Sequence, residues 1–365
     1  MNILFIVDTL GSGGKERRLT ELILELARRS LVNPFLVLLE SESKSDIHYK
    51  TVLNLGIEIY YLGGKSKKKL PFEIYRLCKS NNIDIINTWA PAVHTYLILP
   101  TKILLRLPII NNSITSARNN LSKLEMFKIR ATYLFSTIVC SNSNQALKIF
   151  KVPQNKRRVV YNGFRSSRLD NLETEDNIRK IFKIDTSHVV AMAAEYSSRK
   201  NYSTYIKAAN IVLAKRDDVT FLCMGSGDRE KYKINIEGQN TSRINLLGRM
   251  DDVESIFKIC SIGVLSSEIE GIPNSILEFM ALGKPVIANI CEGVGTAELV
   301  EDGASGFLIE PKNEILMAEK INVLLNDTGL RDRMGEYGRT VVSNKFSIDQ
   351  MVERFLGLYK EVLNK

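Results

Sequence analysis

Short apolar runs alternate with longer amphipathic stretches along this chain, and this alternation constrains the fold more than any other feature of the sequence. Helical patterns such as residues 17–29 and 72–80 separate the runs. Near-continuous apolar strands are typical of sheets that are covered on both faces, so the pattern favours a doubly wound parallel sheet. Six strands are predicted in the first half: residues 3–7, 35–39, 57–61, 83–87, 108–112 and 136–140.

The same pattern restarts after about residue 165. A polar segment, residues 163–176, precedes the restart and is the predicted boundary. The chain has 365 residues, which is enough for two separate cores. We therefore predict two similar α/β domains. Six strands are predicted in the second: residues 188–194, 219–225, 243–248, 262–267, 285–289 and 306–311.

The charge is distributed unevenly between the two halves. Residues 1–165 carry 25 lysines and arginines against 11 acidic residues, whereas residues 166–365 carry 25 against 30, which gives net charges of +14 and −5. A basic surface suits an anionic lipid leaflet, an anionic acceptor or nucleic acid, and solubility alone is the simpler alternative. No nucleic-acid-binding module is evident, so we expect a membrane surface or anionic acceptor and no nucleic acid.

The cysteine pattern and the apolar segments bear on the compartment. Five scattered cysteines without a CxxC pair fit reduced thiols in a cytosolic protein. The apolar run at the N-terminus is too short for a signal peptide. The apolar stretch 93–110 is interrupted by Pro100, Lys102, Arg106 and Pro108, so it is a poor transmembrane helix. We expect a cytoplasmic protein, peripheral on the inner face of the cell membrane.

The first glycine-rich loop, DTLGSGGKERRL, occupies residues 8–19, between a predicted strand and a predicted helix. This layout presents backbone N–H groups to phosphate. Gly11 and Gly13 match the start of a dinucleotide-binding fingerprint, but Glu16 stands where its third glycine belongs. The loop therefore indicates either a tight strand-to-helix turn or a contact with an anion.

A second cluster, EYSSRKNYSTYIKAA, follows the predicted strand 188–194. Arg199 and Lys200 would project from a strand end, where open α/β sheets bind ligands, and two adjacent cations suit a diphosphate. The alternative is a solvated charge pair at the start of a helix, where the helix dipole disfavours cations.

A third cluster, EGIPNSILEFMALGKPVIA, begins at Glu270. Pro273 is well placed to start a helix whose buried stripe is apolar. Glu270 falls in the turn and Glu278 in the helix, at most ~12 Å apart along a helical path. That separation fits a nucleotide diphosphate sugar with one acid at each end, and the alternative is a solvent-facing pair of glutamates.

Taken together, these segments resemble the family-4 retaining glycosyltransferases. The most specific match runs from Val264 to Pro311, where EGIPNSILEFMALGKPVIA and GTAELVEDGASGFLIEP are similar to the E-x7-E region of that family and its following loop. SGGKERRLTELILELA, VVYNGF and RKNYSTYIKAA resemble further family segments in the same order. The resemblance covers most of the chain.

The resemblance implies the GT-B fold: two Rossmann-like, doubly wound parallel-sheet domains facing across a cleft. Residues 1–165, together with the C-terminal helix 345–365, would form the acceptor-side domain. Residues 166–344 would form the domain that binds the nucleotide sugar.

The resemblance also implies roles for individual residues. Glu270 matches the acid that contacts the donor sugar, and Lys200 matches the lysine that binds the diphosphate, with Arg199 beside it. Gly13 and Gly14 match the loop that approaches the donor phosphates. The other donor-binding positions are Glu278, which matches the acid on the nucleotide ribose, and Gly271, Ile272, Pro273, Asn274, Ser275 and Glu298.

Two positions depart from the pattern of the family. Glu195 stands where an arginine usually precedes the phosphate lysine by five positions. The segment INNSITSARNN, residues 110–120, lacks the histidine found near the transferred sugar in many members, and Arg118 or Asn119 is expected to occupy that space.

The implied activity is transfer of a sugar, with retention, from a nucleotide diphosphate sugar to a lipid-linked or polysaccharide acceptor in cell-surface glycan biosynthesis. We favour a UDP-sugar as donor. No Asp-x-Asp occurs in the chain, so we expect no metal, and no cofactor beyond the donor substrate. The basic stretches 65–69 and 117–130 favour an acceptor near an anionic membrane.

Three alternatives stay open at this point. A nucleotide-sugar epimerase with the GT-B fold uses the same donor class, and a non-catalytic nucleotide-sugar-binding partner subunit would keep the fold without turnover. A nicotinamide-dependent oxidoreductase ranks last because the glycine fingerprint is incomplete.

Overall fold

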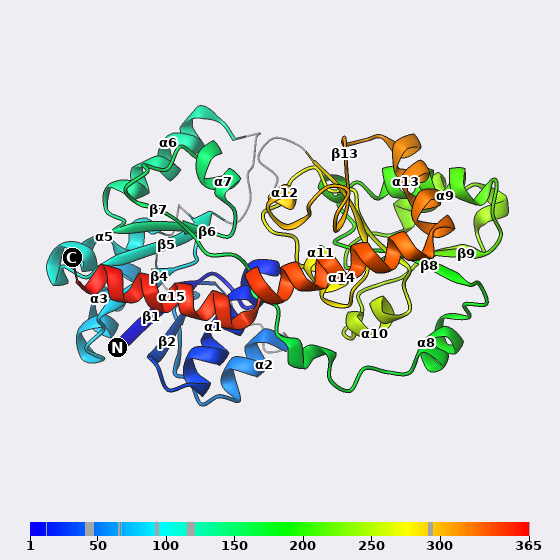
Figure 1. Cartoon of the computed structure of the whole chain (residues 1–365). Coiled ribbons are helices and arrows are strands. Elements are labelled where there is room, and N and C mark those ends of the chain that lie inside the picture. The colour runs from blue at the N-terminus through cyan, green and yellow to red at the C-terminus, as the bar shows by residue number, and fades with distance from the viewer. Residues whose placement is uncertain are drawn as a thin grey trace. The chain divides into compact units, whose positions relative to one another are not determined.

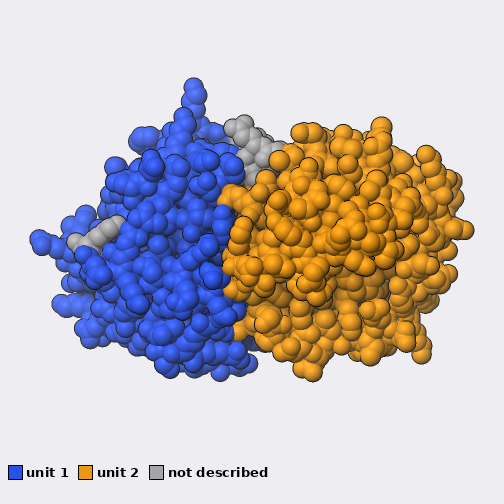
Figure 2. Space-filling view, viewed as in Figure 1, with its two compact units in different colours: residues 1–163, 348–365 blue, residues 164–347 orange. Residues whose placement is uncertain are grey.

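The computed structural model describes residues 1–11, 13–40, 47–64, 66, 68–91, 95–114, 121–290 and 295–364. The chain divides into two compact units, which Figures 1 and 2 show and which are described separately here. Unit 1 comprises Met1–Gly163 and Ile348–Lys365, and unit 2 comprises Phe164–Ser347.

Unit 1 contains a seven-stranded parallel sheet in the order β3-β2-β1-β4-β5-β6-β7. The six predicted strands are confirmed, and each of their ends lies within two residues of its predicted position. A seventh strand was missed. The strands are β1 (Asn2–Val7), β2 (Asn33–Leu38), β3 (Ile59–Tyr61), β4 (Ile85–Thr88), β5 (Ile109–Ile114), β6 (Ile138–Ser141) and β7 (Arg157–Val159).

Helices cover both faces of this sheet (Figure 1). One face packs against α1 (Gly14–Arg28), α2 (Ile47–Leu53) and the C-terminal helix α15 (Ile348–Leu363). The other face packs against α3 (Leu70–Ser80) and the short 3-10 helix η1 (Tyr96–Ile98), which leads into α5 (Leu99–Leu105). Beside β5–β7 lie α6 (Lys123–Ala131), η2 (Thr132–Leu134) and α7 (Asn144–Ile149).

Helix α15 belongs to unit 1 because its buried side chains complete the core of that unit. The buried Arg18 donates a hydrogen bond of 2.6 Å to the carbonyl of Val160. Its guanidinium lies 4.9 Å from the ring centre of Trp89 and 5.4 Å from that of Phe355, a residue of α15. Cation–π contacts of this kind stabilise a desolvated arginine, whose pKa is lowered here by burial.

Unit 2 contains a six-stranded parallel sheet in the order β10-β9-β8-β11-β12-β13, and all six predicted strands are confirmed. The chain order reverses between β8 and β11, which makes this pair the topological switch point of the sheet. The strands are β8 (His188–Ala193), β9 (Val219–Met224), β10 (Ile244–Leu246), β11 (Ile262–Leu265), β12 (Val286–Asn289) and β13 (Gly306–Ile309).

Short and long helices alternate with these strands. The 3-10 segments are η3 (Ser166–Leu169), η4 (Ser198–Lys200), η5 (Glu230–Asn235) and η6 (Gly238–Asn240). The α-helices are α8 (Glu175–Phe182), α9 (Tyr202–Leu213), α10 (Val253–Lys258), α11 (Asn274–Ala281), α12 (Thr296–Leu299), α13 (Glu314–Asn326) and α14 (Thr328–Lys345).

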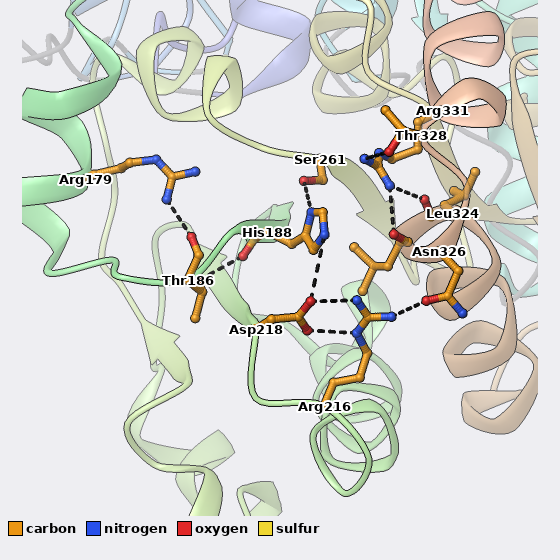
Figure 3. A network of polar contacts seen from close by, with 11 residues as sticks. Arg179, Thr186, His188, Arg216, Asp218, Ser261, Leu324, Asn326, Thr328 and Arg331 are labelled. Atoms are coloured by element: carbon orange, nitrogen blue, oxygen red, sulfur yellow. Dashed lines mark hydrogen bonds and ion pairs between the residues drawn. The ribbon is translucent and has the colours of Figure 1, made fainter.

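A polar network ties together the amino ends of the strands in unit 2 (Figure 3). His188 begins β8, and its Nδ1 lies 3.2 Å from the hydroxyl of Ser261, just before β11. Its Nε2 lies 3.9 Å from Asp218, which Arg216 holds with two hydrogen bonds of 2.9 and 2.7 Å. Burial and the nearby Arg331 lower the pKa of His188. This edge lies opposite the carboxyl ends, so the network is structural.

Two further expectations concern membrane-spanning helices and the cysteines. Within the described residues, no helix is both long and apolar enough to cross a membrane. The four cysteines in the described residues are buried free thiols, as the sequence predicts: Cys78, Cys140, Cys223 and Cys260.

Candidate functional site

A lysine and a glutamate pair at the topological switch point of unit 2. Lys200 ends η4 after β8, and Glu270 lies in the loop after β11, the strand next to β8. The Lys200 ammonium donates to Glu270 Oε1, and the two side chains are only 15% and 13% exposed. The structure thus brings together the predicted diphosphate lysine and the predicted donor-sugar acid, from positions 70 apart in the sequence.

Backbone contacts join the two loops that carry this pair. The backbone N–H of Glu268 donates to the carbonyl of Arg199 at 3.0 Å. The buried Ser266 hydroxyl lies 3.0 Å from the carbonyl of Lys200 and 2.8 Å from that of Asn201. Asn289, at the end of β12, donates to the carbonyl of Ser266 at 2.7 Å. Lys200 and Glu270 are therefore positioned before any ligand arrives.

Asn201 shapes the turn that aims Lys200. Its φ of 52° lies in the left-handed region, which asparagine tolerates better than most residues. Its side chain caps α9 by accepting from the N–H of Thr204 and also donates to Glu268 at 3.1 Å. Lys312 lies 3.4 Å from the same carboxylate. Glu268 thus holds the loop after β11 to two other segments.

Helix α11 begins where the sequence predicts, directly after Pro273, which is its N-cap. Glu278 lies inside the unit, not on the surface, with 3% of its area exposed. Arg168 of η3 reaches Glu278 Oε1 at 3.4 Å and also forms an ion pair with the buried Glu254 of α10. The two glutamates of the E-x7-E segment therefore have different cations, Lys200 and Arg168.

Five of the other predicted donor-binding residues of unit 2 follow Glu270 directly in the sequence. Gly271, Ile272 and Pro273 are buried, whereas Asn274 and Ser275, at the start of α11, are half-buried. The N–H of Gly295 donates to the carbonyl of Glu270 at 3.2 Å, and Glu298 follows in α12.

Arg199 stands apart from the central pair. Its guanidinium lies 3.8 Å from Glu195, and the two side chains are 38% and 56% exposed. The structure therefore leaves Lys200 as the more buried of the two predicted phosphate-binding cations.

In unit 1, Gly13 is the N-cap of α1 and Gly14 is its first residue. A Cβ on Gly13 would meet the carboxylate of Glu16 at 2.2 Å, so this side chain folds over the start of the helix. Lys15 lies 3.1 Å from Asp8 and 3.3 Å from Glu16. The predicted acceptor-side residues Arg118 and Asn119 lie outside the described residues.

Sequence reasoning missed four residues that organise this site: Arg168, Asn201, Ser266 and Glu268. An asparagine directly before an amphipathic helix is a recognisable cap signal, so Asn201 could have been found. Arg168 lies 110 positions from Glu278, and no local pattern connects them.

Comparison with known proteins identifies the second unit. Residues 173–341 match the family model described as glycosyl transferases group 1. Unit 2 belongs to this family. An N,N'-diacetylbacillosaminyl-diphospho-undecaprenol alpha-1,3-N-acetylgalactosaminyltransferase of Campylobacter jejuni is 25% identical over 80% of this chain and 81% of its own length.

Two further similarities extend over almost the whole chain. A second Campylobacter jejuni enzyme, an alpha-1,4-N-acetyl-D-galactosaminyltransferase that acts on an undecaprenol-linked glycan, is 23% identical over 100% of this chain and 99% of its own. The crystal structure of Anabaena HepE in complex with UDP matches with a TM-score of 0.84 at 20% identity, covering 99% of this chain and 100% of HepE. The chain has the GT-B fold.

Proposed function

We propose that this protein transfers a sugar from a nucleotide diphosphate sugar, with a UDP-sugar as donor, to a lipid-linked or polysaccharide acceptor. The ion pair of Lys200 and Glu270 carries the proposal. It stands at the switch point of a group 1 domain, where open α/β sheets bind their ligands.

The chemistry of this pair suits the two parts of such a donor. Lys200, with Arg199 beside it, would bind the diphosphate and stabilise the negative charge that develops as it leaves. Glu270 would accept hydrogen bonds from hydroxyls of the transferred sugar. The N-terminus of α11 carries partial positive charge and adds a further stabilising group for the phosphates.

Other residues would bind the remaining parts of the donor. Glu278 would bind the nucleotide ribose, held in place by Arg168. Gly271–Ser275 and Glu298 would line the donor, while Gly13 and Gly14 would approach its phosphates from unit 1. Arg118 and Asn119 would face the acceptor.

The relatives support the donor and the acceptor class. HepE was crystallised with UDP and with UDP-glucose, which favours UDP as the nucleotide here. Both Campylobacter enzymes carry undecaprenol-linked glycans in their names, and a further relative from Staphylococcus aureus is a capsular polysaccharide biosynthesis glycosyltransferase. We propose a cytoplasmic enzyme of cell-surface glycan assembly.

Calorimetric binding of UDP, GDP and ADP to the full chain tests the donor site. We expect UDP to bind with the same affinity in magnesium and in EDTA. Lys200→Ala should weaken binding about 10- to 100-fold, as expected for loss of a charged hydrogen bond. Lys207→Ala is the matched control, because Lys207 of α9 is 55% exposed and pairs with Glu314 at 3.9 Å.

Equal UDP affinity in the Lys200→Ala and Lys207→Ala variants would overturn the site assignment. Turnover is tested with UDP-sugars and a lipid-linked acceptor, and the anomeric proton coupling of the product reports retention. An epimerase would convert the donor sugar without acceptor. Tight UDP binding without either reaction would point to a partner subunit.

A further inference from the structure

Helix α6 and the 3-10 turn η2 that follows it expose a stripe of large apolar side chains. Leu124 is 61% exposed, Phe127 is 69% exposed and Leu134 is 85% exposed. Leu124 and Phe127 are three residues apart in α6 and so lie on the same side of that helix, and Leu134 follows in η2. No residue of α6 is buried.

The opposite side of α6 already supplies the contacts that hold the helix to unit 1. Met126 and Ile129 pack against a buried cluster that includes Val139 and Leu147. The exposed side chains of the stripe are therefore not needed to pack α6 against unit 1. Single exposed apolar residues are ordinary, but a continuous stripe marks a surface that binds something.

A second exposed apolar pair lies on the neighbouring helix α5, where Ile103 is 66% exposed and Leu104 is 64% exposed. The segment η1, which leads into α5, contacts α6 and the end of η2. The Tyr96 hydroxyl, just before α5, donates to the carbonyl of Lys128 in α6, and the rings of Tyr96 and Phe135 lie 5.7 Å apart.

The charge around these helices has one sign. Between Leu99 and Leu134, the stretch that contains α5, α6 and η2, the sequence has six lysines and arginines and a single acidic residue, Glu125. Glu125 is engaged at the start of α6, where it accepts from the N–H of Ser122 at 2.8 Å in a capping box. Within the described residues, the cations of α6 form no ion pair: Lys123, Lys128 and Arg130.

We propose that the α6–η2 surface, formed by Leu124, Phe127, Leu134 and the flanking cations, docks on an anionic phospholipid leaflet. The apolar stripe would enter the boundary between headgroups and acyl chains, and the cations would contact anionic headgroups. This surface does not involve the donor site, so the docking proposal can be tested independently of the proposed transferase activity.

The positive charge of the α6–η2 surface, together with its apolar side chains, favours a membrane over a second copy of the chain or a nucleic acid. A second copy of the chain would bring the same cations to the interface, and like charges repel. A nucleic acid would meet the cations but give the exposed leucines no role. An anionic leaflet satisfies both features at once.

Tryptophan fluorescence of the Phe127→Trp variant tests the docking directly. The chain has one tryptophan, Trp89, which is buried and gives a constant background. With vesicles of phosphatidylglycerol and phosphatidylcholine at low salt, we expect a blue shift and quenching by brominated lipid. Vesicles of phosphatidylcholine alone should give a much smaller signal.

Vesicle co-sedimentation measures the partition coefficient of the protein between water and the vesicles. The Leu124→Ser/Phe127→Ser variant should lower the partition coefficient at least tenfold, and Lys123→Gln/Lys128→Gln should lower it about 25-fold, roughly fivefold per cation. The control is Ile234→Ser in unit 2, where Ile234 is 90% exposed. UDP binding by every variant should equal that of the parent chain.

Three outcomes would overturn the proposal. The parent chain fails to bind anionic vesicles at low salt, or the Leu124→Ser/Phe127→Ser variant binds them as well as the Ile234→Ser control. In the third, the parent chain does not bind vesicles, and sedimentation velocity shows a dimer that only the Leu124→Ser/Phe127→Ser change disrupts. That result would mean that the stripe binds a second copy of the chain.

Discussion

Replacing Arg168 with methionine should destabilise unit 2 strongly. Arg168 bridges two buried carboxylates, with side-chain exposures of 7% for Glu254 and 4% for Glu278. At an effective dielectric constant of about 20, an ion pair at 3.4 Å contributes about 5 kcal/mol before desolvation is counted. Because truncation leaves both carboxylates without this cation, we expect the free energy of unfolding to fall by about 3 to 5 kcal/mol.

Thermal unfolding of the full chain, followed by circular dichroism, measures this loss. Unit 2 spans residues 164–347, and for domains of that size 1 kcal/mol shifts Tm by about 2 to 4 °C. The transition of unit 2 should therefore move down by about 6 to 20 °C. Arg243→Met is the matched control, because Arg243 pairs with the 78% exposed Asp185, and an exposed pair contributes little to stability.

A rescue experiment separates charge from lost contacts. Arg168 also lies over the ring of Phe164 at 5.2 Å, so methionine removes a cation–π contact as well. Adding Glu254→Gln and Glu278→Gln to Arg168→Met should restore most of the stability, since the two buried carboxylate charges that Arg168 compensates are then removed as well. The reasoning is refuted if Arg168→Met unfolds like the Arg243→Met control, or if the triple variant is no more stable than Arg168→Met.

Three further predictions rest on other parts of unit 2. The lowered pKa of His188 means that the unfolded state takes up its proton first, so the free energy of unfolding should fall as pH drops below about 6.5, and His188→Gln should flatten that slope in urea titrations. Gly263→Ala should cost about 1 to 3 kcal/mol, because its Cβ would meet the buried Phe279 ring at 2.3 Å, whereas Gly238→Ala, with open space around it, should unfold nearly like the parent. Glu195→Gln should tighten UDP binding by about two- to fivefold in calorimetry, because it releases Arg199 from an exposed ion pair, and unchanged affinity would contradict this.

The strands could be predicted from the sequence because burial on both faces leaves nearly continuous apolar runs. Each of the twelve predicted strands has a counterpart in the structure. β7 was missed because it has only three residues, RRV, all half-buried, and carries no such run. Helix α6 was not predicted either, because its apolar residues lie on two sides and blur the usual helical stripe.

The site was predictable only where local patterns carry it. The turn at Glu270 and the helix start at Pro273 follow from residue types in sequence, and the structure has both. The ion pair with Lys200 depends on β8 and β11 being neighbours, which local periodicity does not specify. Glu278 was expected either on a ribose or in solvent. Its burial against Arg168 depends on a contact across 110 positions.

The charge balance at the switch point has a consequence for ligand binding. Lys200 is neutralised by Glu270, and Arg199 lies within 4 Å of Glu195, so both predicted phosphate-binding cations already have acidic partners. A diphosphate must therefore share these cations with two carboxylates. Sharing favours a ligand that also offers hydroxyls to Glu270, because a free diphosphate would leave that carboxylate poorly compensated in a half-buried site. The proposed donor site should therefore prefer a nucleotide sugar over the bare nucleotide.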